Sequence, residues 1–227
     1  MVTSEAISPN IQDYAKAVYA LEERQGAAVS TTDLADRLDV TPGSVSAMVR
    51  KLSELGLVEH ERYHGVRLTS TGRRVALEVL RHHRLIELFL ATELGMPWDQ
   101  VHAEAEVLEH VLSEQLEQLI AKRLGDPTLD PNGDPIPTPT FDVAQRETHS
   151  LDQLESGAAG RFVRVSDSDP AMLRYLAEQG ISLGDRLEVS SRQPFEGPVF
   201  VRFSGRELPL GGQLARAMRI ELEESGR

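Results

Sequence analysis

Three short segments near the start of the chain place apolar residues every three or four positions, a spacing typical of amphipathic helices. The first spans residues 11–24, and the second runs from a capping Thr31 or Thr32 to Leu38. The third spans residues 41–56 and ends at a glycine, which suits a helix C-cap. The pattern therefore predicts three consecutive helices.

A two-stranded hairpin is predicted next, because apolar and polar residues alternate over 57–74 around His64 and Gly65. Three helices followed by a basic hairpin predict a winged helix-turn-helix DNA-binding domain over residues 1–75. Small polar side chains at the start of the third helix suit base edges, and the basic residues that follow suit phosphates. We therefore predict DNA contacts from Thr41, Gly43, Ser44, Ser46, Ala47, Arg50, Lys51, His64 and Arg67.

Two longer helical patterns follow over residues 75–94 and 99–124, separated by Gly95 and Pro97. The second pattern places four potential metal ligands within a sector of about 100° around the helix, and the first adds an imidazole and a carboxylate at i,i+4. These six residues are His83, Glu87, His102, Glu106, Glu109 and His110. The other side of the second helix is expected to pack through Leu108, Val111, Leu112, Leu116 and Leu119. The apolar stripe formed by the first three of these residues also favours a dimer.

The chemistry of this cluster favours a divalent transition ion such as Mn²⁺ or Fe²⁺, because its ligands are carboxylates and imidazoles without thiolate. Glu106 and Glu109 are like charges at i,i+3, which repel each other unless a cation lies between them. A solvated polar helix face is the alternative explanation. The region contains neither paired Glu-x-x-His motifs nor His-Glu-x-x-His, so a binding protein is favoured over a metal-storage or redox enzyme.

The last third of the chain begins with a proline-rich segment, residues 125–139, which predicts a linker or extended tether. Short alternating segments after it predict strands, with a helix over 170–179 that Asp169 caps ahead of a proline. Short strands at this spacing indicate a small β-barrel. The predicted domains are a winged helix (1–75), a helical metal-binding and dimerisation domain that includes the linker (76–150, linker 125–150) and a barrel (151–227).

The chain has 227 residues and a formal net charge of −12, which at first argues against DNA as a partner. Residues 1–75 carry nine Lys/Arg against ten Asp/Glu, whereas the rest carries fifteen against twenty-six. A near-neutral head with clustered basic residues is compatible with DNA binding. The sequence has no cysteine, no secretory signal pattern and no apolar run of membrane-spanning length. We therefore expect a cytoplasmic protein without a membrane partner.

The segments DYAKAVYALEER, RHHRLIELFL, VHAEAEVLEH, GDPIP and AMRIEL, with the winged-helix pattern, resemble the diphtheria toxin repressor family of iron- and manganese-dependent regulators. The resemblance extends over almost the whole chain. It implies a mainly α protein with a small β part: a winged helix-turn-helix, a helical dimerisation domain and a C-terminal SH3-like barrel. It also implies metal-dependent binding to an operator.

The same resemblance implies two sets of metal ligands. Asp13, Glu106, Glu109 and His110 match the ligands of the manganese-type members, and Lys16 stands where those members have a glutamate. Iron-type members have methionine and cysteine at the positions of Asp13 and Glu106, so the oxygen ligands here favour Mn²⁺. An ancillary site is implied at His83, Glu87, His102 and Asp169.

We therefore expect a DNA-binding regulator that depends on Mn²⁺ and represses metal-uptake genes when the metal is bound. Co²⁺ or Zn²⁺ is expected to substitute in vitro. A homodimer on a palindromic double-stranded operator is the expected assembly, and the protein is not expected to be an enzyme. The alternatives are an Fe²⁺-dependent regulator of the same family and a winged-helix regulator that is not controlled by metal.

Overall fold

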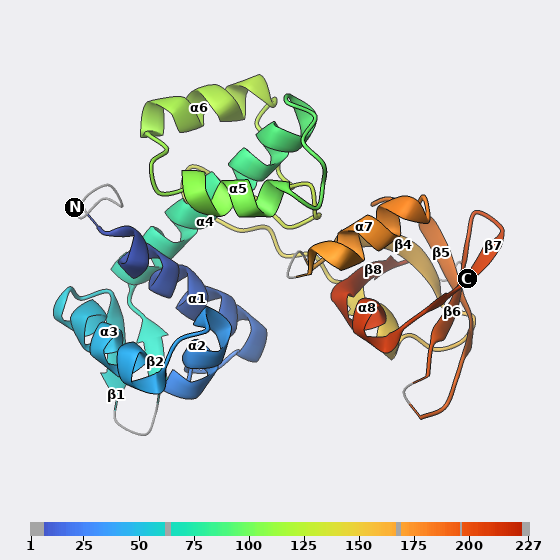
Figure 1. Cartoon of the computed structure of the whole chain (residues 1–227), viewed down its shortest axis with the longest axis horizontal. Helices are drawn as coiled ribbons and strands as arrows, with labels where there is room; N and C mark the ends of the chain where they lie inside the picture. The colour runs from blue at the N-terminus through green and yellow to red at the C-terminus, as the bar shows by residue number, and fades with distance from the viewer. Residues whose placement is uncertain (1–6, 62–64, 167–168, 196, 224–227) are drawn as a thin grey trace. The chain divides into compact units, whose positions relative to one another are not determined.

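The computed structural model describes residues 7–61, 65–166, 169–195 and 197–223 (Figure 1). The chain forms two compact units. The first comprises residues up to 86 together with 105–126 and 137–143, and the second comprises residues 87–104, 127–136 and 144 onward. Each unit has a hydrophobic core of its own.

The first unit begins with three helices and an antiparallel hairpin, as the sequence predicts (Figure 1). Val58 pairs with Leu68 across the hairpin, and Val29 of the connection between the first two helices pairs with Val66. The helices and the hairpin share one core of buried aliphatic side chains. The elements are α1 (Pro9–Gln25), α2 (Thr31–Leu38), α3 (Pro42–Glu54), β1 (Val58–Glu61) and β2 (Gly65–Leu68).

Helix caps fix where these helices begin. The predicted cap of α2 at Thr31 or Thr32 is wrong: Ser30 has the extended backbone of an N-cap, and its Oγ accepts a hydrogen bond from the Asp33 amide at 3.0 Å. Thr41 caps α3 in the same way, accepting from the Ser44 amide at 3.2 Å. The predicted glycine end of α3 is present at Gly56, whose φ is 70°.

The helical region differs from the sequence prediction at one important point. Its helices are α4 (Ser70–Thr92), α5 (Val101–Leu108) and α6 (Glu114–Arg123), so the single helix predicted over 99–124 is wrong. Ser113 has extended backbone and caps α6 by accepting a hydrogen bond from the Leu116 amide. The interruption bends the chain immediately after α5 and leaves Glu109 and His110 at its C-terminal end.

Most of the apolar stripe along 108–119 is exposed in the single chain and does not pack within it. Only Leu112 is buried, whereas the other four predicted residues keep between 38% and 76% of their surface exposed. Val107 joins them with 69% exposed. We name this exposed set the α5–α6 apolar surface: Val107, Leu108, Val111, Leu116 and Leu119.

A buried polar network connects α4, α6 and the end of the proline-rich segment. Arg81 Nε donates to Glu117 Oε1 at 2.7 Å, and Arg81 Nη1 donates to the Pro137 carbonyl at 2.6 Å. His82 Nε2 lies 3.4 Å from Glu117 Oε2. Burial acts to raise the pKa of Glu117, but His82 and Arg81 more than offset this and hold the pKa below its usual value.

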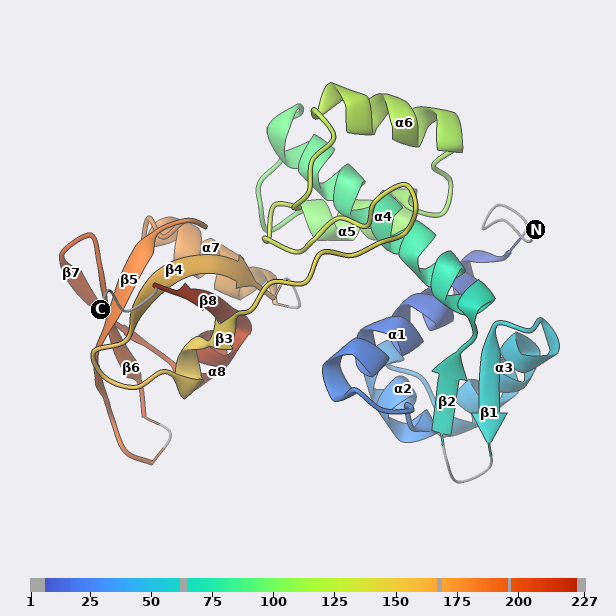
Figure 2. The same ribbon diagram turned by 180° about the vertical axis from the view of Figure 1, so that it is seen from behind.

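The second unit is built on one antiparallel six-stranded sheet, in the order β3-β8-β4-β5-β6-β7 (Figure 2). The predicted strands and helix are present, and the sequence did not predict the short β3 and α8. Asp169 caps α7 as predicted, accepting from the Ala171 amide at 2.9 Å. The elements are β3 (His149–Ser150), β4 (Ala159–Val165), α7 (Pro170–Glu178), β5 (Arg186–Arg192), β6 (Val199–Phe203), β7 (Arg206–Leu210), α8 (Gly212–Ala217) and β8 (Met218–Leu222).

The proline-rich segment contains no helix or named strand, but it is anchored rather than extended in solvent. Asn132 is fully buried and accepts a hydrogen bond from the Trp98 indole at 2.7 Å. Gly133 has a φ of 82°, and a Cβ atom there would lie 2.0 Å from the Val163 carbonyl oxygen, so only glycine allows this approach. Further along, Phe141 packs against the core of the first unit.

No helix in the described part of the chain is long and apolar enough to cross a membrane.

Replacing Glu117 with glutamine should lower the free energy of unfolding by about 2 kcal/mol, because Arg81 then keeps only neutral partners. The full difference in stability between the variant and the wild type is expected above the ordinary pKa of a glutamate. The difference should shrink as the pH falls below that value, because the pKa of Glu117 is lowered in the folded protein. Urea denaturation at several pH values measures this. Glu114→Gln, at an exposed position of the same helix, is the matched control, and an equal effect of both changes would contradict the network.

Candidate metal centre

Two groups of potential metal ligands form in the described part of the chain. The first contains Asp13, Glu109 and His110, and the second contains His83, His102 and Glu106. Within each group, one ligand atom per residue lies within 4.8 Å of the others. All six residues are among the predicted ligands. The family resemblance implies that Glu106 shares a site with Asp13, whereas in the structure Glu106 lies in the group of His83 and His102.

The first group joins α1 to the end of α5. Asp13 comes from the second turn of α1, and Glu109 and His110 follow the last residue of α5. Glu109 is buried, with 1% of its surface exposed, whereas Asp13 and His110 are partly exposed. Burial raises the pKa of Asp13, although nearby His110 and Lys16 act in the opposite direction.

The hydrogen bonding of His110 points to a cation. The side-chain amide nitrogen of Gln12 donates to the Ile7 carbonyl. The amide oxygen of Gln12 therefore faces His110 Nδ1, at 2.5 Å, and because this oxygen can only accept, His110 Nδ1 must be the donor. A neutral imidazole then directs the lone pair of Nε2 toward Asp13 Oδ1, 3.1 Å away. Two acceptors that face each other need a proton or a metal ion between them. Orientation of a ligating histidine through its second nitrogen is usual in metal sites.

Glu109 is the centre of the polar contacts. Its Oε1 accepts a hydrogen bond from Lys16 Nζ at 2.6 Å, and its Oε2 lies 2.5 Å from His83 Nδ1. Its backbone carbonyl lies 3.1 Å from His82 Nδ1. A buried carboxylate of this kind is tolerated only with charged or hydrogen-bonding partners. Glu109 therefore has partners on both α1 and α4.

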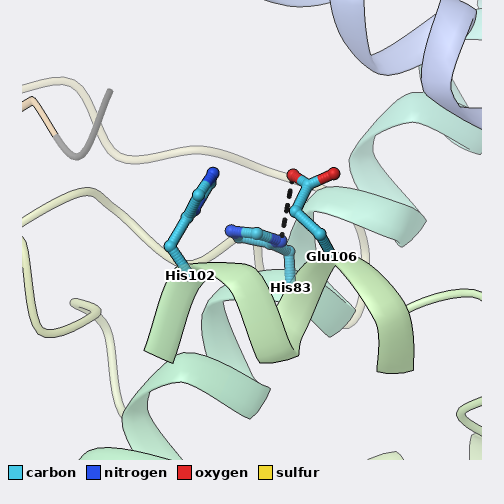
Figure 3. A group of neighbouring side chains, drawn as sticks. All are labelled: His83, His102 and Glu106. Atoms are coloured by element: carbon cyan, nitrogen blue, oxygen red, sulfur yellow. Dashed lines mark ion pairs between the residues drawn. The ribbon is translucent and has the colours of Figure 1, made fainter. Parts of the chain in front are cut away.

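The second group lies between α4 and α5 (Figure 3). His83 Nδ1 is 3.7 Å from Glu106 Oε1, and His102 extends from the same helix as Glu106 toward the same space (Figure 3). His102 Nδ1 lies 3.0 Å from Oε1 of the fully buried Glu87, so Nδ1 donates to Glu87 and Nε2 is the ring nitrogen that could coordinate a metal. In this arrangement Glu87 orients His102, as carboxylates behind metal-bound histidines do.

Lys16 contributes a contact that the sequence did not predict. Its Nζ donates to Glu106 Oε1 at 2.8 Å and to Glu109 Oε1 at 2.6 Å, so it links one carboxylate of each group. Burial acts to lower the pKa of Lys16, but these two carboxylates more than offset it and raise the pKa above its usual value. The orienting role of Gln12 was also not predicted, because an amide beside Asp13 carries no recognisable signal.

Asp169 joins neither group of described residues, and its Oδ1 is engaged in capping α7. The remaining donor sets fit a divalent cation, because each combines imidazole nitrogen with carboxylate oxygen and the acceptors converge. The sequence contains no thiolate ligand.

The predicted DNA contacts lie at the start of α3 and on the hairpin. All of the predicted contact residues that the structure describes are exposed: Thr41, Gly43, Ser44, Ser46, Ala47, Arg50, Lys51 and Arg67. His64 lies outside the described residues. Thr41 and Ser46 also stabilise the first turn of α3, since Ser46 Oγ donates to the Pro42 carbonyl at 2.9 Å.

A winged helix-turn-helix connected to nitrogen and oxygen metal ligands defines a metal-responsive DNA-binding regulator. Three family models match the chain. Residues 6–66 match the iron-dependent repressor N-terminal DNA-binding domain, residues 69–138 match the iron-dependent repressor metal-binding and dimerisation domain, and residues 149–222 match the FeoA domain.

Individual relatives agree with these matches. The regulator MntR of Bacillus subtilis is 35% identical over 106 residues, which are 47% of this chain and 73% of MntR. The iron-dependent repressor IdeR of Mycobacterium tuberculosis is 40% identical over 100 residues, 44% of this chain and 43% of IdeR. A solved manganese-dependent transcriptional repressor in complex with manganese superposes with a TM-score of 0.88 at 43% identity, covering 94% of this chain and all of that one.

The chain belongs to the iron-dependent repressor family, the diphtheria toxin repressor family that the sequence motifs resemble. It is a metal-dependent DNA-binding transcriptional repressor of that family, with a C-terminal FeoA domain, and not an enzyme.

Proposed function

We propose that the protein is a manganese-dependent repressor that binds a palindromic operator as a homodimer and silences metal-uptake genes in the cytoplasm when the metal is bound. The observation that carries this proposal is the first ligand group. Asp13 belongs to α1 of the DNA-binding head, whereas Glu109 and His110 follow α5. Binding one ion with both elements would therefore change how firmly the head is held.

The physical basis is the pair of facing acceptors. Without a cation between them, the lone pair of His110 Nε2 and the facing oxygen of Asp13 repel each other, which disfavours their close approach. A bound divalent ion supplies the positive charge that both acceptors and Glu109 can share. Gln12 keeps His110 oriented in both states, because its amide is itself fixed by the Ile7 carbonyl. Metal occupancy and head position are thereby coupled, and the coupling extends reciprocally to DNA binding.

The oxygen-rich donor set supports Mn²⁺ as the activating ion. Asp13 and Glu106 provide carboxylate oxygens, which are harder ligands than thioether and thiolate sulfur and favour Mn²⁺ relative to softer ions. Imidazole ligands would also accept Fe²⁺, Co²⁺ or Zn²⁺, and we expect Co²⁺ and Zn²⁺ to substitute in vitro. Solved relatives include a manganese-dependent repressor bound to manganese.

Two exposed surfaces of the first unit support the proposed DNA interface and the proposed dimer. The first turn of α3 presents small polar groups, as a helix that enters the major groove requires. The α5–α6 apolar surface gathers five exposed aliphatic side chains between positions 107 and 119, and grouped exposed apolar residues are typical of protein interfaces. A two-fold dimer through this surface would place two heads on half-sites about 34 Å apart, which makes the operator palindromic.

Mn²⁺ should tighten operator binding about 5- to 150-fold, the usual range of allosteric coupling, and Asp13→Ala should abolish this difference. Electrophoretic mobility shifts with Mn²⁺ and with chelator measure both proteins. Asp36→Ala, at an exposed position of α2 in the same head, is the control and should respond like the wild type. Equal wild-type affinity with Mn²⁺ and with chelator would instead favour a winged-helix regulator that metal does not control.

Glu106→Cys should shift the preference for activating ions from Mn²⁺ toward Fe²⁺, because it replaces a hard oxygen ligand by a softer sulfur. Anaerobic operator-binding titrations at controlled free-ion concentrations give the ratio of the two activation constants. Glu104→Cys, exposed on the same helix, should leave that ratio unchanged. The manganese assignment fails if Fe²⁺ is already the better activator of the wild type.

Val111→Asp should convert the dimer to a monomer and weaken operator binding at least tenfold, because it places a charge in the α5–α6 apolar surface. Sedimentation equilibrium measures the mass. Phe195→Asp is the matched control, since Phe195 is fully exposed on the sheet domain and its replacement should leave the dimer intact. A dimeric Val111→Asp protein would place the interface elsewhere.

A further inference from the structure

Lys16 lies between the two ligand groups. Its ammonium nitrogen is 2.8 Å from Glu106 Oε1 and 2.6 Å from Glu109 Oε1, and it is the same oxygen atom of Glu109 that faces His110 Nε2 at 3.6 Å. The side chain of Lys16 is 16% exposed and that of Glu109 is completely buried. The ammonium is therefore a built-in part of the polar cluster and not a surface charge that happens to lie near it.

An ion that bridged Glu106 and Glu109 would need the space that Nζ fills. We infer that Lys16 is a tethered cation that takes the place of a second metal ion between these carboxylates, so that the cluster of Asp13, Glu106 and Glu109 binds a single divalent ion. This inference rests on the proposed function.

The charges of the cluster agree with this assignment. Asp13, Glu106 and Glu109 together carry three negative charges, and Lys16 reduces their sum to two, which one divalent ion neutralises. A glutamate at position 16 would leave four negative charges and would require two divalent ions.

The position of Lys16 in α1 has a second effect. Lys16 follows Asp13 by three residues, so both side chains lie on the same face of α1. Lys16 already connects α1 to α5 without a metal ion, through hydrogen bonds to Glu106 of α5 and to buried Glu109 directly after it. The ion that Asp13 and His110 bind would add to an existing connection instead of creating the only one.

The test compares the number of bound Mn²⁺ ions in four full-length proteins: the wild type, Lys16→Glu, Lys16→Arg and Lys122→Glu. Equilibrium dialysis counts the ions per protomer, and electron paramagnetic resonance distinguishes isolated Mn²⁺ from an exchange-coupled pair. Lys16→Glu should bind one more ion than the wild type and should show the coupled-pair spectrum. Lys16→Arg keeps the positive charge, and Lys122→Glu makes the same charge change at an exposed site of α6, so both should keep the wild-type count.

A coupled pair in the wild type would overturn the inference while leaving the proposed function intact. An unchanged ion count in a folded Lys16→Glu protein would do the same. Absence of Mn²⁺ binding by the wild type would overturn the proposed function and the inference with it.

A second variant keeps the inference falsifiable if Lys16→Glu does not fold. Lys16→Met removes the charge while nearly keeping the length, and it should lower the melting temperature of the metal-free protein by about 3–8 °C, because Glu109 loses its ammonium partner. Circular dichroism measures the transition with chelator present. An unchanged melting temperature would show that Lys16 is not the cation that stabilises this cluster.

Discussion

The burial of one carboxylate, Glu109, is the constraint on which the candidate metal centre depends. An ionised carboxylate is stable inside a protein only where other groups replace the hydration that it loses. Lys16, His83 and His110 each have a nitrogen within 3.6 Å of its carboxylate oxygens, and His82 contacts its backbone carbonyl. The end of α5 is consequently fixed against α1 and α4 by the partners of a single residue. Both ligand groups contact this residue: Glu109 belongs to the first group, and His83 of the second group lies 2.5 Å from its Oε2.

Local signals predicted most of the fold correctly. The apolar spacing of α1 to α4, the proline after Asp169 and the alternation of the late strands depend on residues close in sequence, and such patterns are visible in one chain. The break between α5 and α6 was missed because 99–124 keeps a helical period throughout. Ser113 is the N-cap that starts α6. The sequence did not reveal this new helix start, because it depends on the burial of Leu112 in the folded chain.

The sequence suggested which residues belong to the candidate site but not the contacts between them. Spacing placed His102, Glu106, Glu109 and His110 on one face of a helix, and family resemblance added Asp13. The contact of Lys16 with both glutamates joins residues about ninety positions apart, so no local pattern could predict it. The same is true of Gln12, whose importance depends on which atom of His110 it faces. Long-range polar pairs require the tertiary structure.

Residues 137–143, at and beyond the end of the proline-rich segment, limit where the chain can be cut into separate domains. Residues 137–143 belong to the first unit, where Phe141 and Val143 pack against the core and the ring of Phe141 lies 5.2 Å from the Arg74 guanidinium carbon. Arg81 is held there by the Pro137 carbonyl. Removal of the sheet domain at the end of α6 would therefore also remove part of the head's own core. In sequence the repressor's modules are interleaved, and a natural relative that lacks the sheet domain would need other side chains to cover Arg74 and Arg81.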